Sequence, residues 1–356
     1  MSAVLEIDLD AIAANWCALD ASHPGATAGV IKADAYGLGA MRVAPKLRAA
    51  GCEHFFVAHL AEALAVRPLI PRAMLGVLNG LRAGEAEAFS AEGITPVLGS
   101  LEEIALWQAE ALRLNQKLPA ILHADTGMSR LGLSPHDLTL LRDVPDRLDG
   151  LRLDYVMTHL ISADTPGDTR NAKQAAAFTA IAQQFPDAAT SFANSSGMFL
   201  GAAFYSDLAR PGAALYGVNP TPGEENPMRE AVRLSAPILQ IRELQPGETV
   251  GYNGYWTATR PSRIAVLGVG YADGYHRILS NTGTARFDGV QVPLVGRVSM
   301  DLTTFDVTDV PARPGDLLEL IGPGHGADAL ALEAGTNGYE ILTSLGRRYA
   351  RRYIGA

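Results

Sequence analysis

The sequence predicts an α/β protein with an N-terminal (β/α)8 barrel of the TIM type and a C-terminal, mostly-β domain. Up to Gly217, apolar runs typical of buried parallel strands alternate with amphipathic helical segments. A segment rich in proline and glycine follows at residues 219–227. Beyond it the apolar runs are short and separated by turn residues, as in small all-β domains. We therefore expect residues 1–226 to form the barrel, which would bind a cofactor as argued below, and residues 227–356 to form the β-domain.

Eight apolar runs are expected to be the barrel strands. They lie at residues 29–32, 55–59, 73–78, 95–98, 120–124, 155–159, 191–194 and 213–217. The clearest helical patterns lie at residues 10–19, 41–50, 60–66 and 101–114, the last of which opens with the capping pattern Ser100 and Glu103. A final helix-like segment covers residues 337–349. A doubly wound parallel sheet is the alternative architecture.

Composition excludes several classes of function. The net charge of −9 and the pI near 5.4 argue against a nucleic-acid or anionic-membrane surface. Cys17 and Cys52 form no CxxC pair, which suits a reducing compartment, and no signal peptide or long apolar span is evident. We expect a cytoplasmic protein. The histidines show no HExxH or paired spacing, so we expect no protein-bound metal.

Lys32 is the first candidate for a catalytic residue. It ends the apolar run 26–31, and a turn-like segment and a helical pattern follow it. Side chains at the carboxyl ends of barrel strands form the active sites of such folds, and a desolvated lysine amine can form an imine. A lysine at the end of a strand is more often simply exposed to solvent. The position of Lys32 and the small number of lysines in the chain favour the catalytic interpretation. The other lysines, Lys46, Lys117 and Lys173, fall in polar helical or loop segments.

A phosphate site is predicted on the same rim. Ser195 follows the seventh expected strand, and Arg210-Pro-Gly lies beside the eighth. The backbone N–H groups of Gly212 and Ala213 could bind a phosphate together with the Ser195 hydroxyl. Arg-Pro-Gly alone would more often be a surface turn. An imine-forming lysine and a phosphate site together indicate pyridoxal 5'-phosphate.

Five ordered motifs resemble those of bacterial alanine racemases, which are pyridoxal phosphate enzymes of fold type III. The motifs are VIKADAYG (30–37), DTGMSRLG (125–132), RPGAALYG (210–217), GYADGY (270–275) and GRVSMD (296–301). The resemblance runs from about residue 5 to 353, across both expected domains.

The resemblance implies a homodimer that interconverts L- and D-alanine, with no nucleic-acid or membrane partner. Lys32 would hold the cofactor as an aldimine, and Tyr252 would be a second base reaching in from the other subunit. Arg210 would contact the pyridine nitrogen, with His159 behind it. The other implied residues are Tyr36, Ser195, Gly212, Ala213 and Tyr339 for the phosphate, Arg130, Tyr271 and the Met300 backbone for the substrate, and Arg277, Arg297 and Asp164 for the access channel.

Racemisation explains why two bases of different type are needed. A proton must leave one face of a planar carbon and return to the other, which a single side chain cannot easily do. A tyrosine with its ordinary pKa of about 10 needs cationic or hydrogen-bonding neighbours to act near neutral pH, and His159 and Arg210 are candidates. Arg210 would keep its proton and so make the cofactor ring a weaker electron sink, which favours racemisation over transamination.

Three positions depart from the motifs of the resembled family. A lysine that becomes carbamylated is common where this chain has His123, and the support of Arg130 then needs another explanation. Asn337 replaces an apolar residue near the access channel, and Ser299 replaces a cysteine. Asn337 keeps open the alternative of a broad-specificity or serine racemase. A non-catalytic pyridoxal-phosphate-binding barrel is a further alternative, although such proteins lack the β-domain and Tyr252. Two roles fit such an enzyme: wall precursor synthesis and alanine catabolism.

Overall fold

A parallel barrel forms the N-terminal part of the structure, a computed structural model that describes residues 2–355. Its sheet has the order β2-β10-β9-β8-β7-β6-β5-β4-β3. The strands are β2 (Ala26–Thr27), β3 (Gly29–Val30), β4 (His54–Val57), β5 (Met74–Val77), β6 (Thr95–Leu98), β7 (Leu118–His123), β8 (Leu151–Met157), β9 (Ala189–Ser191) and β10 (Leu208–Ala209). The α-helices are α1 (Leu9–Ser22), α2 (Lys32–Tyr36), α3 (Ala40–Ala50), α4 (Leu60–Val66), α5 (Ala86–Ala91), α6 (Leu101–Leu114), α7 (Pro135–Asp143) and α8 (Thr169–Ala182).

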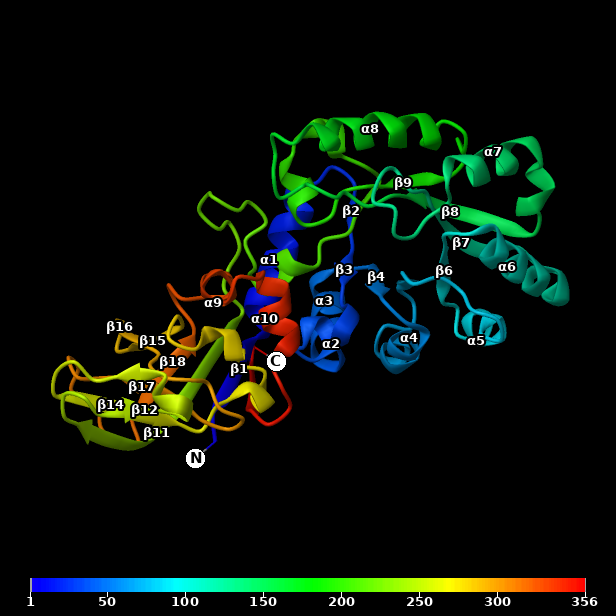
Figure 1. Cartoon of the computed structure of the whole chain (residues 1–356). Coiled ribbons are helices and arrows are strands. Elements are labelled where there is room, and N and C mark those ends of the chain that lie inside the picture. Colours follow the sequence, from blue (N-terminus) through cyan, green and yellow to red (C-terminus); the bar gives the residue numbers. More distant parts are fainter. Residues whose placement is uncertain (1, 356) are drawn as a thin grey trace.

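The barrel closes through one interrupted strand. β2 pairs with β10 and β3 pairs with β4, and only Ala28 separates β2 from β3. Ala28 N donates to Ala209 O at 2.9 Å, and Val30 N donates to Pro211 O at 3.1 Å. Counted as one strand, β2 and β3 complete the predicted eight-stranded barrel, and the doubly wound alternative is wrong. The helices lie on the outside of the sheet (Figure 1).

The prediction for the eighth strand is wrong. Residues 213–217 contain the 3-10 helix η5 (Ala213–Tyr216), and β10 takes the expected place in the sheet. A short, buried apolar run is compatible both with a strand and with a helical turn. Here the run forms a helical turn, which ends at Gly217 with a φ of 86°. Because β10 replaces residues 213–217 as the eighth strand, Gly212 and Ala213 lie in the turn after β10, at the carboxyl end of the barrel.

The expected helices of the barrel are confirmed. α1 buries Ile12, Trp16 and Leu19 on one face. α6 begins at Ser100, whose Oγ accepts from Glu103 N at 3.2 Å. The helix-like segment 337–349 is shorter than expected: α10 (Gly338–Ser344) is followed by a strand. Asn337 caps α10, because its Oδ1 accepts from Glu340 N at 3.0 Å.

The C-terminal part is mostly β, as expected. Its main sheet has the path β16-β15-β18-β11-β1-β19, with β14 and β17 joined to β11 and a separate β12–β13 hairpin. The elements are β1 (Val4–Asp8), β11 (Val232–Leu244), β12 (Thr249–Val250), β13 (Trp256–Thr257), β14 (Ser262–Leu267), β15 (Thr284–Phe287), β16 (Val290–Pro293), β17 (Thr303–Asp306), β18 (Leu317–Ile321), α9 (Ala327–Ala334), α10 and β19 (Ala350–Ile354).

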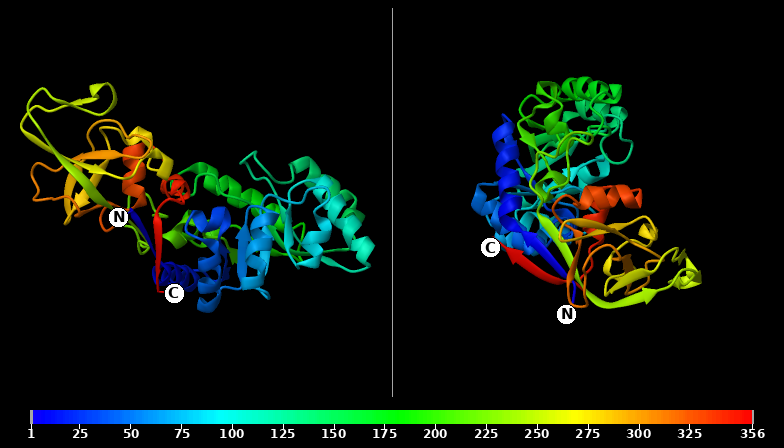
Figure 2. Two further views of the ribbon diagram at one scale, coloured as in Figure 1. Left: turned by 90° about the horizontal axis from the view of Figure 1, so that it is seen from below. Right: turned by 90° about the vertical axis from the view of Figure 1, so that its left-hand side faces the viewer.

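The first and last strands of the chain join the two parts. β1 pairs antiparallel with β11 and parallel with β19 before the chain enters the barrel through α1. In the left view of Figure 2 the β-domain lies at one end of the molecule and the barrel at the other. The boundary between residues 226 and 227 stays a prediction.

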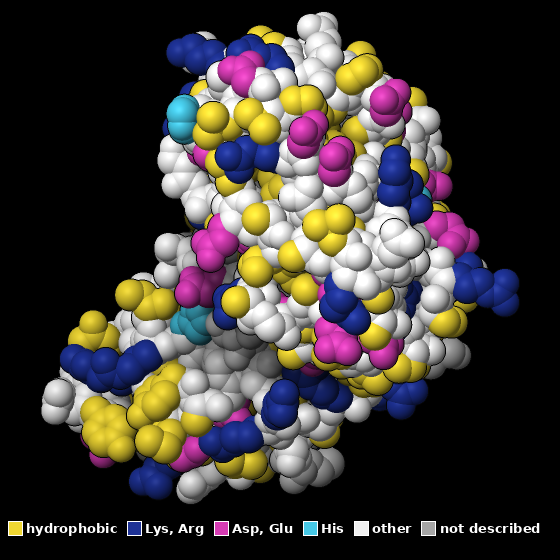
Figure 3. Space-filling view, turned by 90° about the vertical axis from the view of Figure 1, so that its right-hand side faces the viewer, with side chains coloured by type: hydrophobic (Ala, Val, Ile, Leu, Met, Phe, Trp, Pro, Cys, Tyr) yellow, Lys and Arg dark blue, Asp and Glu magenta, His cyan; other side chains and the backbone are white. Residues whose placement is uncertain are grey.

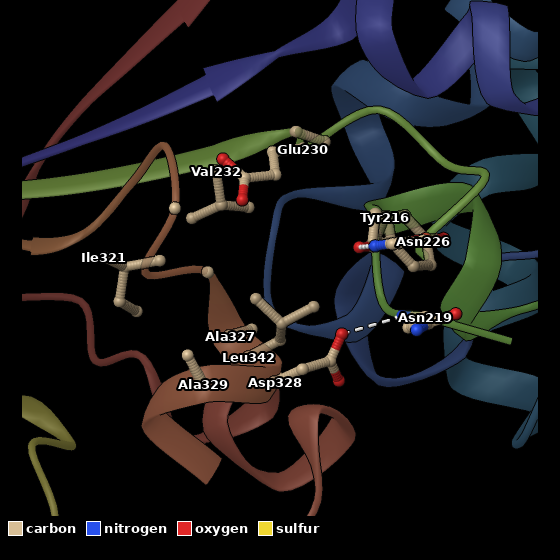
Figure 4. A pocket seen from close by; sticks show the side chains of 14 residues that line it. Tyr216, Asn219, Asn226, Glu230, Val232, Ile321, Ala327, Asp328, Ala329 and Leu342 are labelled. Atoms are coloured by element: carbon tan, nitrogen blue, oxygen red, sulfur yellow. Dashed lines mark hydrogen bonds between the residues drawn. The ribbon is translucent and has the colours of Figure 1, made fainter. Parts of the chain in front are cut away.

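The surface carries charged side chains of both signs and a pocket beside α9. Positive and negative side chains are interspersed on the barrel face shown in Figure 3. A pocket of 240 Å³ lies where the barrel meets α9, and Glu230 and Asp328 line it (Figure 4). Asp328 accepts from Asn219 N at 2.7 Å and so ties α9 to the segment that leaves the barrel.

Within residues 2–355, no helix is long and apolar enough to cross a membrane.

Candidate active site

A pocket of 260 Å³ at the carboxyl ends of the barrel strands gathers most of the predicted site residues. It is lined from six of the barrel's rim segments and from α10 of the β-domain. The lining residues are Val30, Lys32, Tyr36, Leu78, Arg130, His159, Asn194, Ser195, Ser196, Arg210, Gly212, Ala213 and Tyr339.

Lys32 is the first residue of α2, is separated from β3 by Ile31 alone, and is half-buried in this pocket. Burial lowers the pKa of its amine, and the positive charges of Arg130 and Arg210 lower it further, while Glu62 opposes them. A lowered pKa increases the fraction of neutral amine, which is the form that acts as nucleophile or base. The local geometry therefore favours the chemistry that the sequence predicts for Lys32.

The backbone after Lys32 turns in the left-handed sense. Ala33, Asp34, Ala35 and Tyr36 have φ values of 53°, 54°, 54° and 54°. Left-handed helical backbone costs roughly 1–2 kcal/mol per non-glycine residue, so the surrounding structure must hold this turn. The turn directs Tyr36 back over the pocket, where its ring lies 4.9 Å from that of Tyr216.

Ser195 and the turn after β10 form a small polar nest. Gly212 N and Ala214 N both donate to Ser195 Oγ, at 3.0 and 3.2 Å. Gly212 is needed here because a Cβ at this position would lie 2.2 Å from the Tyr36 hydroxyl oxygen. Backbone N–H groups that converge in this way form anion sites. Tyr339 approaches from α10, with its ring 6.4 Å from that of Tyr36.

Arg210 is a buried cation at the base of the pocket. Its side chain donates from Nη1 to Ser191 Oγ at 2.5 Å and from Nη2 to Thr158 O at 2.6 Å. The acceptors are therefore Ser191 and Thr158, not the His159 ring that the resemblance placed behind it. Burial lowers the pKa of Arg210 to about 10, so the guanidinium keeps its proton at neutral pH. Burial and the Arg210 charge lower the pKa of His159 to about 3, which keeps that ring neutral.

Arg130 reaches the pocket from an ordered loop after β7. The Asp125 carboxylate shapes this loop by accepting from Gly127 N at 2.8 Å, Met128 N at 2.9 Å and Ser129 N at 3.0 Å. Arg130 itself is exposed at the pocket mouth. His123 is buried, and burial with the charge of Arg210 lowers its pKa to about 4. His123 is thus neutral and offers Arg130 no negative charge.

Tyr252, Met300 and Tyr271 lie apart from the Lys32 pocket of the same chain. Tyr252 is at the tip of the β12–β13 hairpin, in the 3-10 helix η6 (Tyr252–Gly254), and 68% of it is exposed. It lines a separate, open depression of 410 Å³ with Met300. Met300 and Tyr271 are also exposed, and Ala272 N donates to Met300 O at 3.0 Å. One chain therefore assembles only part of the predicted site.

Sequence reasoning missed four residues that support the pocket. Thr158 and Ser191 fix Arg210. Tyr216 donates to Val30 O at 3.0 Å and packs beneath Tyr36. Glu62 accepts from the backbone beside Lys32. Only Glu62 carried a usable signal, since it is the third residue of α4, where a carboxylate often reaches back to free N–H groups.

The two parts of the chain match the two domains of one protein family. Residues 7–220 match the alanine racemase N-terminal domain, and residues 231–353 match the alanine racemase C-terminal domain.

Individual relatives agree with this assignment over nearly the whole chain. An alanine racemase of Acidiphilium cryptum is 60% identical over 348 residues, or 98% of this chain and 97% of that protein. One of Methylobacterium nodulans is 51% identical over 355 residues, or 98% and 95%. A crystal structure of alanine racemase from Bartonella henselae with covalently bound pyridoxal phosphate superimposes with a TM-score of 0.96 at 42% identity, over 99% of this chain and 100% of that one. With both domains matched in order around the pocket described above, the chain belongs to the alanine racemase family.

Proposed function

We propose that this protein interconverts L- and D-alanine, with pyridoxal 5'-phosphate as cofactor and with Lys32 and Tyr252 as the two bases. The observation that supports this most strongly is the Lys32 pocket. It combines an amine of lowered pKa, a buried cation and a nest of backbone N–H groups at one barrel rim. The related alanine racemase of known structure carries covalently bound pyridoxal phosphate, which agrees with this donor set.

The residues present fit the proposed cofactor. The Ser195 hydroxyl and the N–H groups around Gly212 suit a phosphate, and the absence of a Cβ at Gly212 leaves room for the Tyr36 hydroxyl beside them. Tyr339 and Ala213 would complete the phosphate contacts. Arg210 would donate to the ring nitrogen and, with its pKa of about 10, would not give up its proton. Bound pyridoxal phosphate supplies an electron sink that makes the α-proton of an amino acid acidic.

Racemisation then depends on what the chain's own residues do. Lys32 would hold the cofactor and would move the α-proton on one face of the substrate. Tyr252 moves the α-proton on the other face, that of the L-isomer. Arg130 and the Met300 backbone bind the carboxylate, and Tyr271 closes the access side. The neutral rings of His159 and His123 add no competing acid beside Lys32.

A homodimer would bring these residues together. Tyr252 and Met300 are exposed and do not line the Lys32 pocket of their own chain. A large aromatic side chain at the tip of a projecting hairpin commonly enters a partner's surface. We propose that each hairpin completes the pocket of the second subunit. We also propose a cytoplasmic location and a boundary between the two domains at residues 226–227.

The function is tested with a panel of amino acids. The purified protein, supplied with pyridoxal phosphate, should invert L- and D-alanine faster than serine, lysine or arginine, as measured by chiral chromatography. Asn337 does not favour the broader alternatives, because its side chain is used as the cap of α10. Faster inversion of serine or a basic amino acid would reject alanine as the substrate, and no inversion of any amino acid would reject racemase activity.

Gly212→Ala should weaken cofactor binding. The added methyl group would lie 2.2 Å from the Tyr36 hydroxyl oxygen and would force Tyr36 or the turn out of place. We expect the dissociation constant for pyridoxal phosphate to rise by on the order of tenfold or more, since losing one charge-assisted contact costs about 1.5–3 kcal/mol. An absorbance titration measures this. Gly167→Ala is the control, because Gly167 lies in the loop before α8, has no positive φ and has no atom within 4 Å of the position that a Cβ would take. Equal binding by both variants would contradict the assignment of the nest.

Racemase activity should not depend on dissolved CO2. His123 carries an imidazole, which forms no carbamate as stable as that of a lysine amine, where related enzymes often have a modified lysine. Its pKa of about 4 also leaves the ring neutral rather than negatively charged. Arg130 still needs an acceptor for its guanidinium, and we expect a small anion such as chloride or another side chain to fill that position. Rates in CO2-free and bicarbonate buffers should be equal, and a crystal structure should show an anion or a carboxylate beside Arg130. Activity restored by bicarbonate would contradict the first expectation, and an imidazole alone against Arg130 would contradict the second.

A further inference from the structure

Glu62 connects the turn that carries Lys32 to the neighbouring barrel strand. Its Oε1 accepts from Ala33 N at 2.6 Å, directly after Lys32. Its Oε2 accepts from Ala58 N at 2.7 Å and from His59 N at 3.1 Å, at the end of β4. Both carboxylate oxygens are thus used, and they bridge the carboxyl ends of β3 and β4.

The turn after Lys32 needs such an anchor. Four consecutive residues, 33–36, have left-handed backbone that non-glycine residues rarely adopt. The hydrogen bonds within the turn join residues that are close in sequence. Examples are Gly37 N to Ala33 O at 2.7 Å and Ala40 N to Asp34 Oδ1 at 2.7 Å. Ile31 N, directly before Lys32, donates to Phe56 O of β4 at 2.8 Å, and the bond from Ala33 N to Glu62 spans 29 residues and links the chain directly after Lys32 to the same neighbouring segment.

Charge adds a second connection between Glu62 and Lys32. Lys32 is surrounded by two cations, Arg130 and Arg210, which lower its pKa, and Glu62 opposes them. The His159 ring in the same pocket is neutral at working pH. Glu62 is therefore the negative charge that balances the arginines around Lys32.

We propose that Glu62 is a positioning residue, whose carboxylate holds the left-handed turn and with it the Lys32 backbone at the distance from the substrate that proton transfer requires. The inference rests on the function proposed above. A displacement of about 1 Å at a reacting group can lower a rate by on the order of 10²-fold. Glutamine at position 62 has only one acceptor oxygen, so it can serve Ala33 or the β4 end but not both.

Glu62→Gln is the test, and Glu103→Gln is its matched control. Glu103 is also the third residue of its helix, is half-buried like Glu62, and accepts from Gly99 N at 2.6 Å on the same rim, but it accepts no hydrogen bond from the Lys32 turn. We expect Glu62→Gln to lower kcat for alanine by on the order of 10²-fold with little change in KM, because the substrate contacts remain. Glu103→Gln should leave both close to wild-type values.

A titration of Lys32 separates positioning from general destabilisation. Because the bound cofactor would occupy the Lys32 amine, the measurement uses the full-length chain freed of pyridoxal phosphate. Competitive acetylation at a series of pH values, followed by mass spectrometry, then measures the ionisation of the free Lys32 amine without any turnover. Removing the nearby anion should move the Lys32 titration to lower pH in Glu62→Gln and leave it unchanged in Glu103→Gln. A folded Glu62→Gln with wild-type kcat, or an unshifted Lys32 titration, would overturn the proposal. If the wild-type chain did not racemise alanine, the proposed function would fail, while the titration would still decide whether Glu62 acts on Lys32.

Discussion

Replacing Lys32 with alanine should remove racemisation and the covalent attachment of pyridoxal phosphate together. The side chain is both the proposed attachment point and one of the two bases, and each role alone contributes a large factor. We expect a fall in kcat/KM of on the order of 10³-fold or more. Chiral chromatography measures the rate, and borohydride reduction with peptide mapping measures the attachment.

The other lysines are the controls for this experiment. Lys46 is paired with Asp10 at 2.6 Å, away from the pocket, so Lys46→Ala should stay active. In the wild-type protein the pyridoxyl label should be found on Lys32 alone. A label on Lys46, Lys117 or Lys173, or an active Lys32→Ala, would show that the pocket has been assigned to the wrong chemistry.

Tyr252→Phe should also be inactive, and its activity should return in mixed dimers with Lys32→Ala. Loss of a positioned base costs about 10²–10⁴-fold. If each site takes Lys32 from one subunit and Tyr252 from the other, a hybrid dimer has one intact site and one site that lacks both bases. Random exchange of equal amounts makes half of the dimers hybrid, so activity should recover to about a quarter of the wild-type value.

The control for hybrid formation uses two variants of the same residue. Lys32→Ala mixed with Lys32→Arg should stay inactive, because no combination of these chains restores Lys32 to a site. Subunit exchange is followed with differently tagged chains. If exchange is complete and the Lys32→Ala and Tyr252→Phe mixture still has no activity, the site is not shared between subunits.

The pattern of apolar runs was sufficient to predict the barrel because each buried parallel strand is followed by a helix with its own periodicity. The helix bounds 60–66 and 101–114 agree with α4 and α6, where apolar spacing and the Ser100 cap coincide. The eighth strand was misplaced because β10 has only two residues, Leu208–Ala209, while the longer apolar run after it coils into η5. The pairing of β1 with β11 could not be predicted, since no local pattern reports a contact across more than 200 residues.

The candidate site was predictable where chemistry resides in a side chain at a strand end. Lys32, Ser195 and Arg210 follow β3, β9 and β10, and the structure brings them into one pocket. Supporting contacts were not predictable in the same way. Arg210 is fixed by the backbone carbonyl of Thr158 and the hydroxyl of Ser191. A threonine and a serine carry no sequence signal that would indicate such a role. Met300 and Tyr252 are implied by the resemblance alone, and in the proposed dimer they complete the site of the second subunit.

Exchange of the α-proton in D2O tests the two-base account most directly, because it reports each face of the substrate separately. Wild-type enzyme should incorporate deuterium from both L- and D-alanine and invert both. In Tyr252→Phe, Lys32 remains on its own face, so D-alanine should still exchange its α-proton without inversion, while L-alanine should not exchange. Equal loss of exchange from both isomers, or exchange from L-alanine at the wild-type rate, would contradict the assignment of Lys32 and Tyr252 to opposite faces.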